Sequence, residues 1–206
     1  MRKDNTIPII VLYVIKDTLT VLGVDTLKGS HAFEIVGMSK GAQLVLAASS
    51  RKKIGVFATE FTINSGAHKA AILAADDGAD VYPQACPKFV PLIEGEQFDG
   101  AEVRAAVAEY AAPLKAAGID TLILSCTHYP FIQKEIESEF GSEVTVIDPA
   151  DATAQDTKTV LAAEGLLRSE GAGTLEVCFT ADVERGARIA GRVLPQGKCL
   201  FKEIKL

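Results

Sequence analysis

A cysteine and a histidine stand two residues apart where a strongly apolar run ends, in the segment Ser125-Cys126-Thr127-His128. Residues 122–124 read Leu-Ile-Leu, which is typical of a buried strand, and residues 131–140 have the amphipathic pattern of a helix. A thiol held at a strand end and facing the positive end of a helix is a usable base or nucleophile. His128 can donate or accept a proton near neutral pH. The alternative is a buried cysteine that acts as a small apolar side chain.

The elements that must position this pair alternate almost strictly between strand and helix. Strands are expected at 7–15, 33–38, 53–58, 79–85, 122–125, 143–147, 174–179 and 198–204, and helices at 18–28, 40–48, 60–75, 101–117, 131–140, 150–167 and 182–193. Such alternation with short connections predicts an α/β protein with mainly parallel sheets. Ligands of these folds bind beyond the carboxyl ends of the strands.

Other candidate ligand-binding residues lie at or near such strand ends. Asp17-Thr18 follows the first strand, and Thr59 and Thr62 follow the third. These two threonines either cradle a carboxylate or phosphate, or cap the helix that continues through Ala75. Glu94 lies in an expected loop or irregular helix at 89–96, and loops near strand ends commonly contact ligands.

Composition narrows the class of protein. The 206 residues are 48% hydrophobic and 23% charged, with a net charge of -6, which disfavours a nucleic-acid or membrane-surface binder. The apolar run at 7–15 contains Pro8 and is followed at once by charge, so neither a signal peptide nor a membrane span is expected. No nucleotide-binding glycine motif occurs.

The four cysteines are spread along the chain without metal-site or disulfide spacing. We therefore expect no metal ion and a reducing, cytoplasmic location. Cys178 and Cys199 fall inside expected strands and are interpreted as core residues.

Four segments carry a specific resemblance to glutamate racemases of the aspartate/glutamate racemase superfamily. In order they are IGVFATEFT at 54–62, ACPKFVPLIE at 85–94, DTLILSCTHYP at 120–130 and VIDPA at 146–150. The resemblance implies two flavodoxin-like parallel-sheet domains, with the active site in the cleft between them. It also implies cofactor-independent interconversion of L- and D-glutamate, which supplies peptidoglycan precursors.

The same resemblance implies roles for individual residues. Two cysteines act on opposite faces of the substrate, since a single base would usually return the proton to the same face. Cys126 would be the acid/base of the second domain, His128 would tune its proton, and Thr127 would contact substrate. The other residues implied around the substrate are Thr18, Thr59, Thr62 and Glu94.

The chain departs from the family pattern in its first fifty residues. The Asp-Ser-Gly loop and the Pro-Tyr-Gly segment are absent, and 39–41 read Ser-Lys-Gly where the family has Glu-Pro-Gly. Aligned through 25–28, the family's Ala-Cys-Asn-Thr motif falls on Ile-Lys-Asp-Thr at 15–18, so Lys16 stands in place of the first catalytic cysteine. We expect a truncated, incomplete first domain and little or no racemisation.

These observations predict a domain division and leave other functions open. Residues 1–50 and 149–206 would form what remains of the first domain, and 51–148 the second. One alternative is a non-catalytic racemase-like remnant or regulatory binding protein, with a homodimer covering the exposed apolar surface. A weaker alternative is a cysteine hydrolase, for which the sequence identifies no acidic group to orient His128.

Overall fold

The computed structural model describes residues 12–14, 35–167, 170, 175–194 and 199–205. The chain divides into two compact units, Met1–Gly165 and Leu166–Leu206. Most of the expected first strand and all of the helix expected at 18–28 lie outside the described residues. Among the described helices, none is long and apolar enough to cross a membrane.

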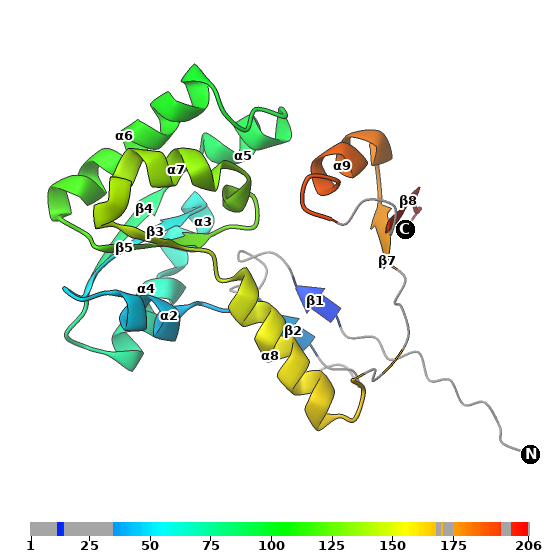
Figure 1. The fold of residues 1–206 in the computed structure, drawn as a ribbon, viewed down its shortest axis with the longest axis horizontal. Coiled ribbons are helices and arrows are strands. Elements are labelled where there is room, and N and C mark those ends of the chain that lie inside the picture. The colour runs from blue at the N-terminus through cyan, green and yellow to red at the C-terminus, as the bar shows by residue number, and fades with distance from the viewer. Residues whose placement is uncertain (1–11, 15–34, 168–169, 171–174, 195–198, 206) are drawn as a thin grey trace, which may run out of the picture. The chain divides into compact units, whose positions relative to one another are not determined.

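The first unit contains a four-stranded parallel sheet in the order β4-β3-β5-β6 (Figure 1). Its strands are β3 (Lys53–Ala58), β4 (Asp80–Ala85), β5 (Thr121–Ser125) and β6 (Thr145–Ile147). The helices between them are α3 (Glu60–Ser65), α4 (Ala67–Ala75), α5 (Phe89–Glu94), α6 (Ala101–Ala117), η1 (Tyr129–Ile132), α7 (Gln133–Phe140) and η2 (Gly141–Glu143). The prediction of an α/β protein with a parallel sheet is confirmed.

Both faces of this sheet are covered, which explains why its central strands are apolar throughout. Side chains of a strand alternate between the faces. Helices α5, α6 and α7 cover one face, and α4 and α2 (Ala42–Ala48) cover the other (Figure 1). Phe57, Leu122 and Leu124 pack on the first face, whereas Val56 and Ile123 pack on the second. The side chains of the consecutive residues Ser125 and Cys126 therefore lie on opposite faces of the sheet.

A shorter parallel pair, β1 (Leu12–Val14) and β2 (Ile35–Gly37), precedes the main sheet along the chain. Helix α8 (Ala150–Ala163) contacts the segment that follows β2. The Thr153 hydroxyl accepts a hydrogen bond of 2.9 Å from the Ser39 backbone N–H. Gly41 then starts α2 with φ of +61°, and a Cβ there would lie 2.3 Å from Ile123 Cδ1. Glycine is required at this crossing for both reasons.

The described part of the second unit is a parallel strand pair with one helix: β7 (Leu175–Phe179), α9 (Val183–Ala190) and β8 (Cys199–Glu203). Phe179 and Phe201 stack across the pair with ring centroids 6.4 Å apart. Cys178 is exposed and Cys199 only partly buried. The interpretation of Cys178 as a core residue was therefore wrong, because its side chain lies on the open face of a two-stranded sheet.

Two expectations about helices are corrected. The helix expected after Thr59 to run unbroken through Ala75 is two helices, because Gly66 ends α3 and starts α4 with φ of +67°. The residues after Cys126 enter the one-turn 3₁₀ helix η1 before α7 begins at Gln133. Pro130 suits such an opening turn, where its missing N–H leaves no helix bond unmade.

Candidate active site

The carboxyl ends of three adjacent strands meet at one level of the sheet. Ala58 of β3 is paired with Ala85 of β4 on one side and with Ser125 of β5 on the other. The next residue of each strand is therefore at the same edge, and these residues are Thr59, Cys86 and Cys126. This is the edge at which parallel α/β sheets bind ligands.

Cys126, His128 and Glu94 form a continuous chain of side-chain contacts at this edge. Cys126 Sγ lies 3.9 Å from His128 Nδ1, and His128 Nε2 lies 2.9 Å from Glu94 Oε1. Because the two contacts use opposite nitrogens of one ring, a proton leaving the thiol has a route to the imidazole while the carboxylate orients that ring. Glu94, the last residue of α5, is thus the acidic group that the sequence did not identify.

Accessibility falls from the carboxylate to the thiol. The Glu94 side chain is 44% exposed and that of His128 is 23% exposed, whereas Cys126 is only 8% exposed. A thiol that is nearly buried, yet linked to solvent through a histidine and a carboxylate, can exchange its proton without being widely open to oxidants or metal ions. This arrangement suits an acid/base better than an inert core cysteine.

The turn after β5 holds the thiol through its backbone. Tyr129 N–H donates to the Cys126 carbonyl at 3.1 Å, and the fully buried Tyr129 hydroxyl donates to the Cys86 carbonyl at 3.4 Å. Phe89 packs edge-on against the Tyr129 ring with centroids 5.1 Å apart. An aromatic anchor therefore fixes the ends of β4 and β5 together.

Thr59 and Thr62 are hydrogen-bonded to each other. Thr59 caps α3 by accepting a hydrogen bond from Thr62 N–H at 3.4 Å, and the two hydroxyl oxygens are 3.0 Å apart. The helix-capping interpretation of Thr59 is thus confirmed. It does not displace the substrate-binding interpretation, since a hydroxyl both donates and accepts, and that interpretation stays a prediction.

The remaining predicted site residues are less informative. Thr127 is partly buried in the turn between Cys126 and His128. Thr18 and Lys16 lie outside the described residues, so the first-domain half of the predicted site stays a prediction.

Two buried groups next to this site did not figure in the predictions. Cys86 is 1% exposed, and burial, together with the nearby Cys126 thiol, raises its pKa far above the ordinary value. His68 is 3% exposed and lies 3.3 Å from Ser125 Oγ through its Nδ1. The sequence signal for Cys86 was its position one residue past β4, matching Cys126 past β5; nothing in the pattern around His68 marks it.

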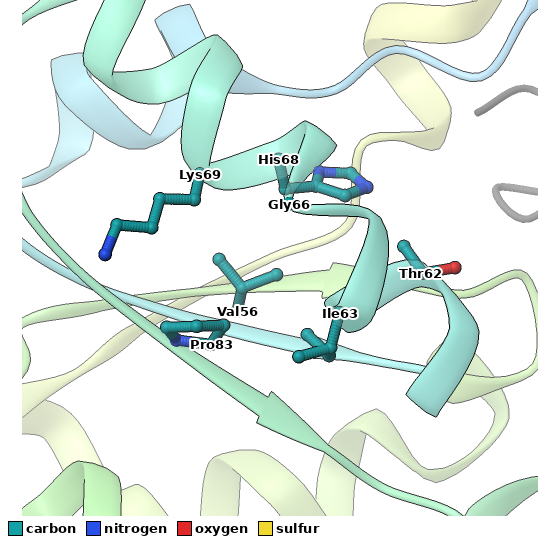
Figure 2. Close-up of a pocket in the computed structure, with 7 residues that line it drawn as sticks. All are labelled: Val56, Thr62, Ile63, Gly66, His68, Lys69 and Pro83. Atoms are coloured by element: carbon teal, nitrogen blue, oxygen red, sulfur yellow. The ribbon is translucent and has the colours of Figure 1, made fainter.

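A small cavity of about 60 Å³ lies beside the second of these groups (Figure 2). It is bounded by Val56 and Pro83 of the sheet and by Thr62, Ile63 and His68 of the α3–α4 segment. Across residues 35–167 and the other described ranges, no three metal-binding side chains come together. None of the four cysteines forms a disulfide bond.

Comparison with known proteins identifies the class to which this fold and site belong. A model of the Asp/Glu/Hydantoin racemase family matches residues 17–157. The chain belongs to this family.

The individual relatives are glutamate racemases. The chain is 36% identical over 197 residues to the glutamate racemase of Lysinibacillus sphaericus strain C3-41, covering 95% of this chain and 74% of the relative. It is 38% identical over 179 residues to that of Aquifex aeolicus strain VF5, covering 86% and 66% respectively. The crystal structure of glutamate racemase isoform RacE1 from Bacillus anthracis superposes with a TM-score of 0.85 at 29% identity, over 95% of this chain and 73% of that one.

The resemblance inferred from four short segments is therefore confirmed. The chain resembles glutamate racemases, which are amino-acid isomerases, over nearly its whole length. It spans about three quarters of the length of the Lysinibacillus relative.

Proposed function

We propose that this chain is a glutamate racemase by descent, in which Cys126 is the acid/base for one face of the substrate. The observation that supports this most directly is the chain of contacts from Cys126 Sγ to His128 Nδ1 and from His128 Nε2 to Glu94 Oε1. Removing the α-proton of an amino acid needs a base that can pass its proton on, and this chain supplies one without a cofactor. Glutamate is the proposed substrate because the relatives carry that name.

Racemisation also needs a second acid on the opposite face, and here the sequence departs from the family. Lys16 occupies the position of the first catalytic cysteine by motif alignment. An ammonium group is a poor partner for a thiolate unless burial lowers its pKa substantially. The proposal is therefore that the chain racemises glutamate little or not at all, while Cys126 still removes and returns the proton on its own face.

Thr59, Thr62, Glu94 and Thr127 are proposed as the second-domain contacts of substrate, and Thr18 as one from the first domain. The proposed domains are 1–50 with 149–206, and 51–148. The hydrogen bond from Ser39 to Thr153 supports grouping α8 with the segment after β2. The proposed setting is cytoplasmic supply of peptidoglycan precursors, and the proposed assembly is a homodimer.

A one-sided proton exchange can be separated from racemisation by one experiment. The protein is incubated with L- or D-glutamate in D₂O, and the α-proton signal is followed by NMR while a coupled assay measures the other enantiomer. We expect loss of the α-proton from one enantiomer without appearance of the other, because a single base returns deuterium to the face it took hydrogen from.

Two variants sharpen the result. Cys126→Ser should abolish the exchange, and Lys16→Cys, which restores the family's second thiol, should convert exchange into racemisation. Rapid racemisation by the unaltered chain that Cys126→Ser abolishes would refute the claim of impairment. No exchange with either enantiomer would instead favour a non-catalytic binding protein.

A cysteine hydrolase is the second candidate, because Cys126, His128 and Glu94 are also the parts of a nucleophile–base–orienter arrangement. The two functions differ in what the thiol does to a carbonyl compound. A burst of p-nitrophenol from p-nitrophenyl acetate, absent in Cys126→Ser, would support the hydrolase. Exchange of the α-proton without such a burst supports the racemase-type acid/base.

A further inference from the structure

A buried histidine contacts the last residue of β5, the strand that Cys126 follows. His68 is the second residue of α4, and its Nδ1 lies 3.3 Å from the hydroxyl of Ser125. His68 is 3% exposed and Ser125 is inaccessible to solvent. A hydrogen bond between two polar side chains at this depth holds both in place, since neither can exchange its partner for water.

Ser125 and Cys126 are consecutive, so they serve opposite faces of the sheet. Cys126 packs with the α5–α7 side of the core, whereas Ile123, two residues before Ser125, packs with Ile72 of α4. His68 lies one helical turn before Ile72, on the same face of α4. The hydrogen bond therefore holds the last residue of β5 on the α4 side of the sheet, while the thiol of the next residue lies on the α5–α7 side.

The same contact reaches the other half of the proposed pocket. His68 is two residues beyond Gly66, where α3 gives way to α4, and α3 carries Thr62, which the Thr59 hydroxyl contacts at 3.0 Å. Figure 2 shows Thr62 and His68 on this one short segment, and both residues line the cavity together with Val56. The bond to Ser125 thus ties the threonine-bearing segment to the thiol-bearing strand.

The imidazole is not packed against other side chains on every side. The cavity of about 60 Å³ adjoins it, and Lys69, the next residue, sends its side chain away from the ring (Figure 2). Where a ring has open space beside it, a directional contact helps to select one orientation. Ser125 Oγ supplies such a contact.

We propose that His68 is a positioning residue for Cys126: through Ser125 it fixes the end of β5, and with it the distance from the thiol to His128. This role rests on the proposed acid/base function of Cys126, but it concerns the thiol itself and not a particular substrate. His68 bonds Ser125 on the α4 side of the sheet, whereas the thiol packs on the other side, so its influence passes through the backbone between Ser125 and Cys126.

The test is the alkylation rate of Cys126 by iodoacetamide, measured by mass spectrometry of the peptide that contains it. The chain is compared with His68→Phe, which removes the polar ring atoms, with His68→Asn, which keeps a polar atom near the position of Nδ1, and with Ser125→Ala. We expect His68→Phe and Ser125→Ala to react more slowly by about threefold to tenfold, the effect of one lost buried hydrogen bond. His68→Asn should restore most of the rate.

Two comparisons exclude a general loss of structure. Thr121→Val removes another buried hydroxyl from the same face of β5, one that makes no hydrogen bond within the described residues, and should leave the rate unchanged. The double variant His68→Phe/Ser125→Ala should react no more slowly than either single variant, because both remove the same bond.

The proposal is overturned if the rate is unchanged or faster in His68→Phe and Ser125→Ala, or if Asn is as slow as Phe at position 68. Should His68→Phe fail to fold, Ser125→Ala and His68→Asn decide the matter by the same criteria. Because alkylation needs no amino-acid substrate, this result stands apart from the deuterium-exchange experiment. If the unaltered chain shows no deuterium exchange, the proposed function is refuted, but the comparison of alkylation rates stays valid.

Discussion

At the scale of single residues, the two thiols at the sheet edge have opposite properties. Cys126 reaches solvent through His128 and Glu94, which gives its proton a route in and out. Cys86 follows the neighbouring strand end but is 1% exposed, and its Sγ is directed to the Gln84 carbonyl at 3.5 Å. Equivalent positions in adjacent strands thus hold one thiol that contacts a partly exposed histidine and one thiol that is sealed in the core.

The first residue-scale prediction concerns Glu94. Glu94→Gln leaves a side chain of equal size that no longer offers His128 a carboxylate, so the ring loses its charge-assisted orientation. We expect alkylation of Cys126 to slow by about threefold to tenfold, a range kept modest because Glu94 is partly exposed. Glu102→Gln, an exposed carboxylate at the start of α6, is the matched control and should react like the unaltered chain. Equal alkylation rates in both variants would show that Glu94 does not contribute to the reactivity of Cys126.

The second concerns the pH dependence of stability through Cys86. Burial raises the pKa of this thiol, so above about pH 8.5, the ordinary pKa of an unfolded cysteine, only the unfolded state ionises. The unfolded state then binds fewer protons than the folded state, and the free energy of unfolding falls by up to about 1.4 kcal/mol per pH unit.

Cys86→Ala should lack this contribution. Urea unfolding at pH 7, 8, 9 and 10 should show a shallower decline above pH 8.5 for the variant than for the unaltered chain. The comparison uses the slopes, so the packing lost with the thiol does not enter. Parallel curves would show that Cys86 ionises equally in both states.

At the scale of elements, a buried carboxylate joins the start of β5 to the segment between α2 and β3. Asp120 is 7% exposed and accepts hydrogen bonds from Ser49 Oγ at 2.5 Å, Arg51 N–H at 2.7 Å and Ser50 Oγ at 3.1 Å. Burial by itself would raise the pKa of Asp120, but these donors, together with the Ser50 backbone N–H, outweigh it and hold the pKa below its usual value. The amino end of the sheet is thus held by a carboxylate, whereas the carboxyl end carries the site.

Asp120→Asn tests this connection. The amide leaves one of the three donors without a suitable acceptor, so we expect a loss of about 1–3 kcal/mol in the free energy of unfolding at pH 7. A lowered folded pKa stabilises the protein above about pH 3.9, the unfolded value, and that contribution is lost as the pH falls through the folded pKa. The difference between variant and unaltered chain should therefore shrink below about pH 4.

The matched control for Asp120 is Glu109→Gln, which breaks an ion pair with Lys88 in which both side chains are about half exposed. Exposed pairs of this kind contribute about 0–1 kcal/mol. Urea titrations of both variants at pH 7 give the comparison. A loss for Asp120→Asn no larger than that for Glu109→Gln would show that the buried connection contributes nothing beyond a surface pair.

At the scale of the whole molecule, the two compact units differ in how much they bury. All residues of β5 are buried, as are Ile54 to Ala58 of β3. In contrast, β7 and β8 have only exposed and intermediate residues, and α9 has no buried residue. Backbone hydrogen bonds of buried strands open only with global unfolding, whereas those of exposed strands open by local unfolding.

Hydrogen–deuterium exchange followed by mass spectrometry tests this difference. Amides of β3 and β5 should be protected with the full free energy of unfolding, and those of β7 and β8 should exchange faster by about tenfold or more. Exchange from α6, whose inner face is buried, provides an internal reference for the first unit. Equal protection of β5 and β7 would show that the second unit is stabilised by contacts beyond its own.

Strands and helices of the main sheet followed from the sequence alone because local patterns determine them. β3 and α6 begin and end at the predicted residues, Lys53–Ala58 and Ala101–Ala117. The continuous apolar strands required two covered faces, and four short segments were enough to indicate the racemase family. Cys126 and His128 were predicted from their position and their neighbours, because a thiol at a strand end, before a helix and two residues from a histidine, stands where parallel sheets bind ligands.

The tertiary structure decided what depends on contacts between residues distant in the sequence. Glu94 and His128 are 34 positions apart, and His68 and Ser125 are 57 apart, so no local pattern shows that they meet. Burial likewise separates Cys86 from Cys126 although each follows a strand, and it places Cys178 at the surface although its strand reads as apolar. Periodicity determines which face a side chain occupies, whereas only the packing of the elements determines what covers that face and which group it meets there.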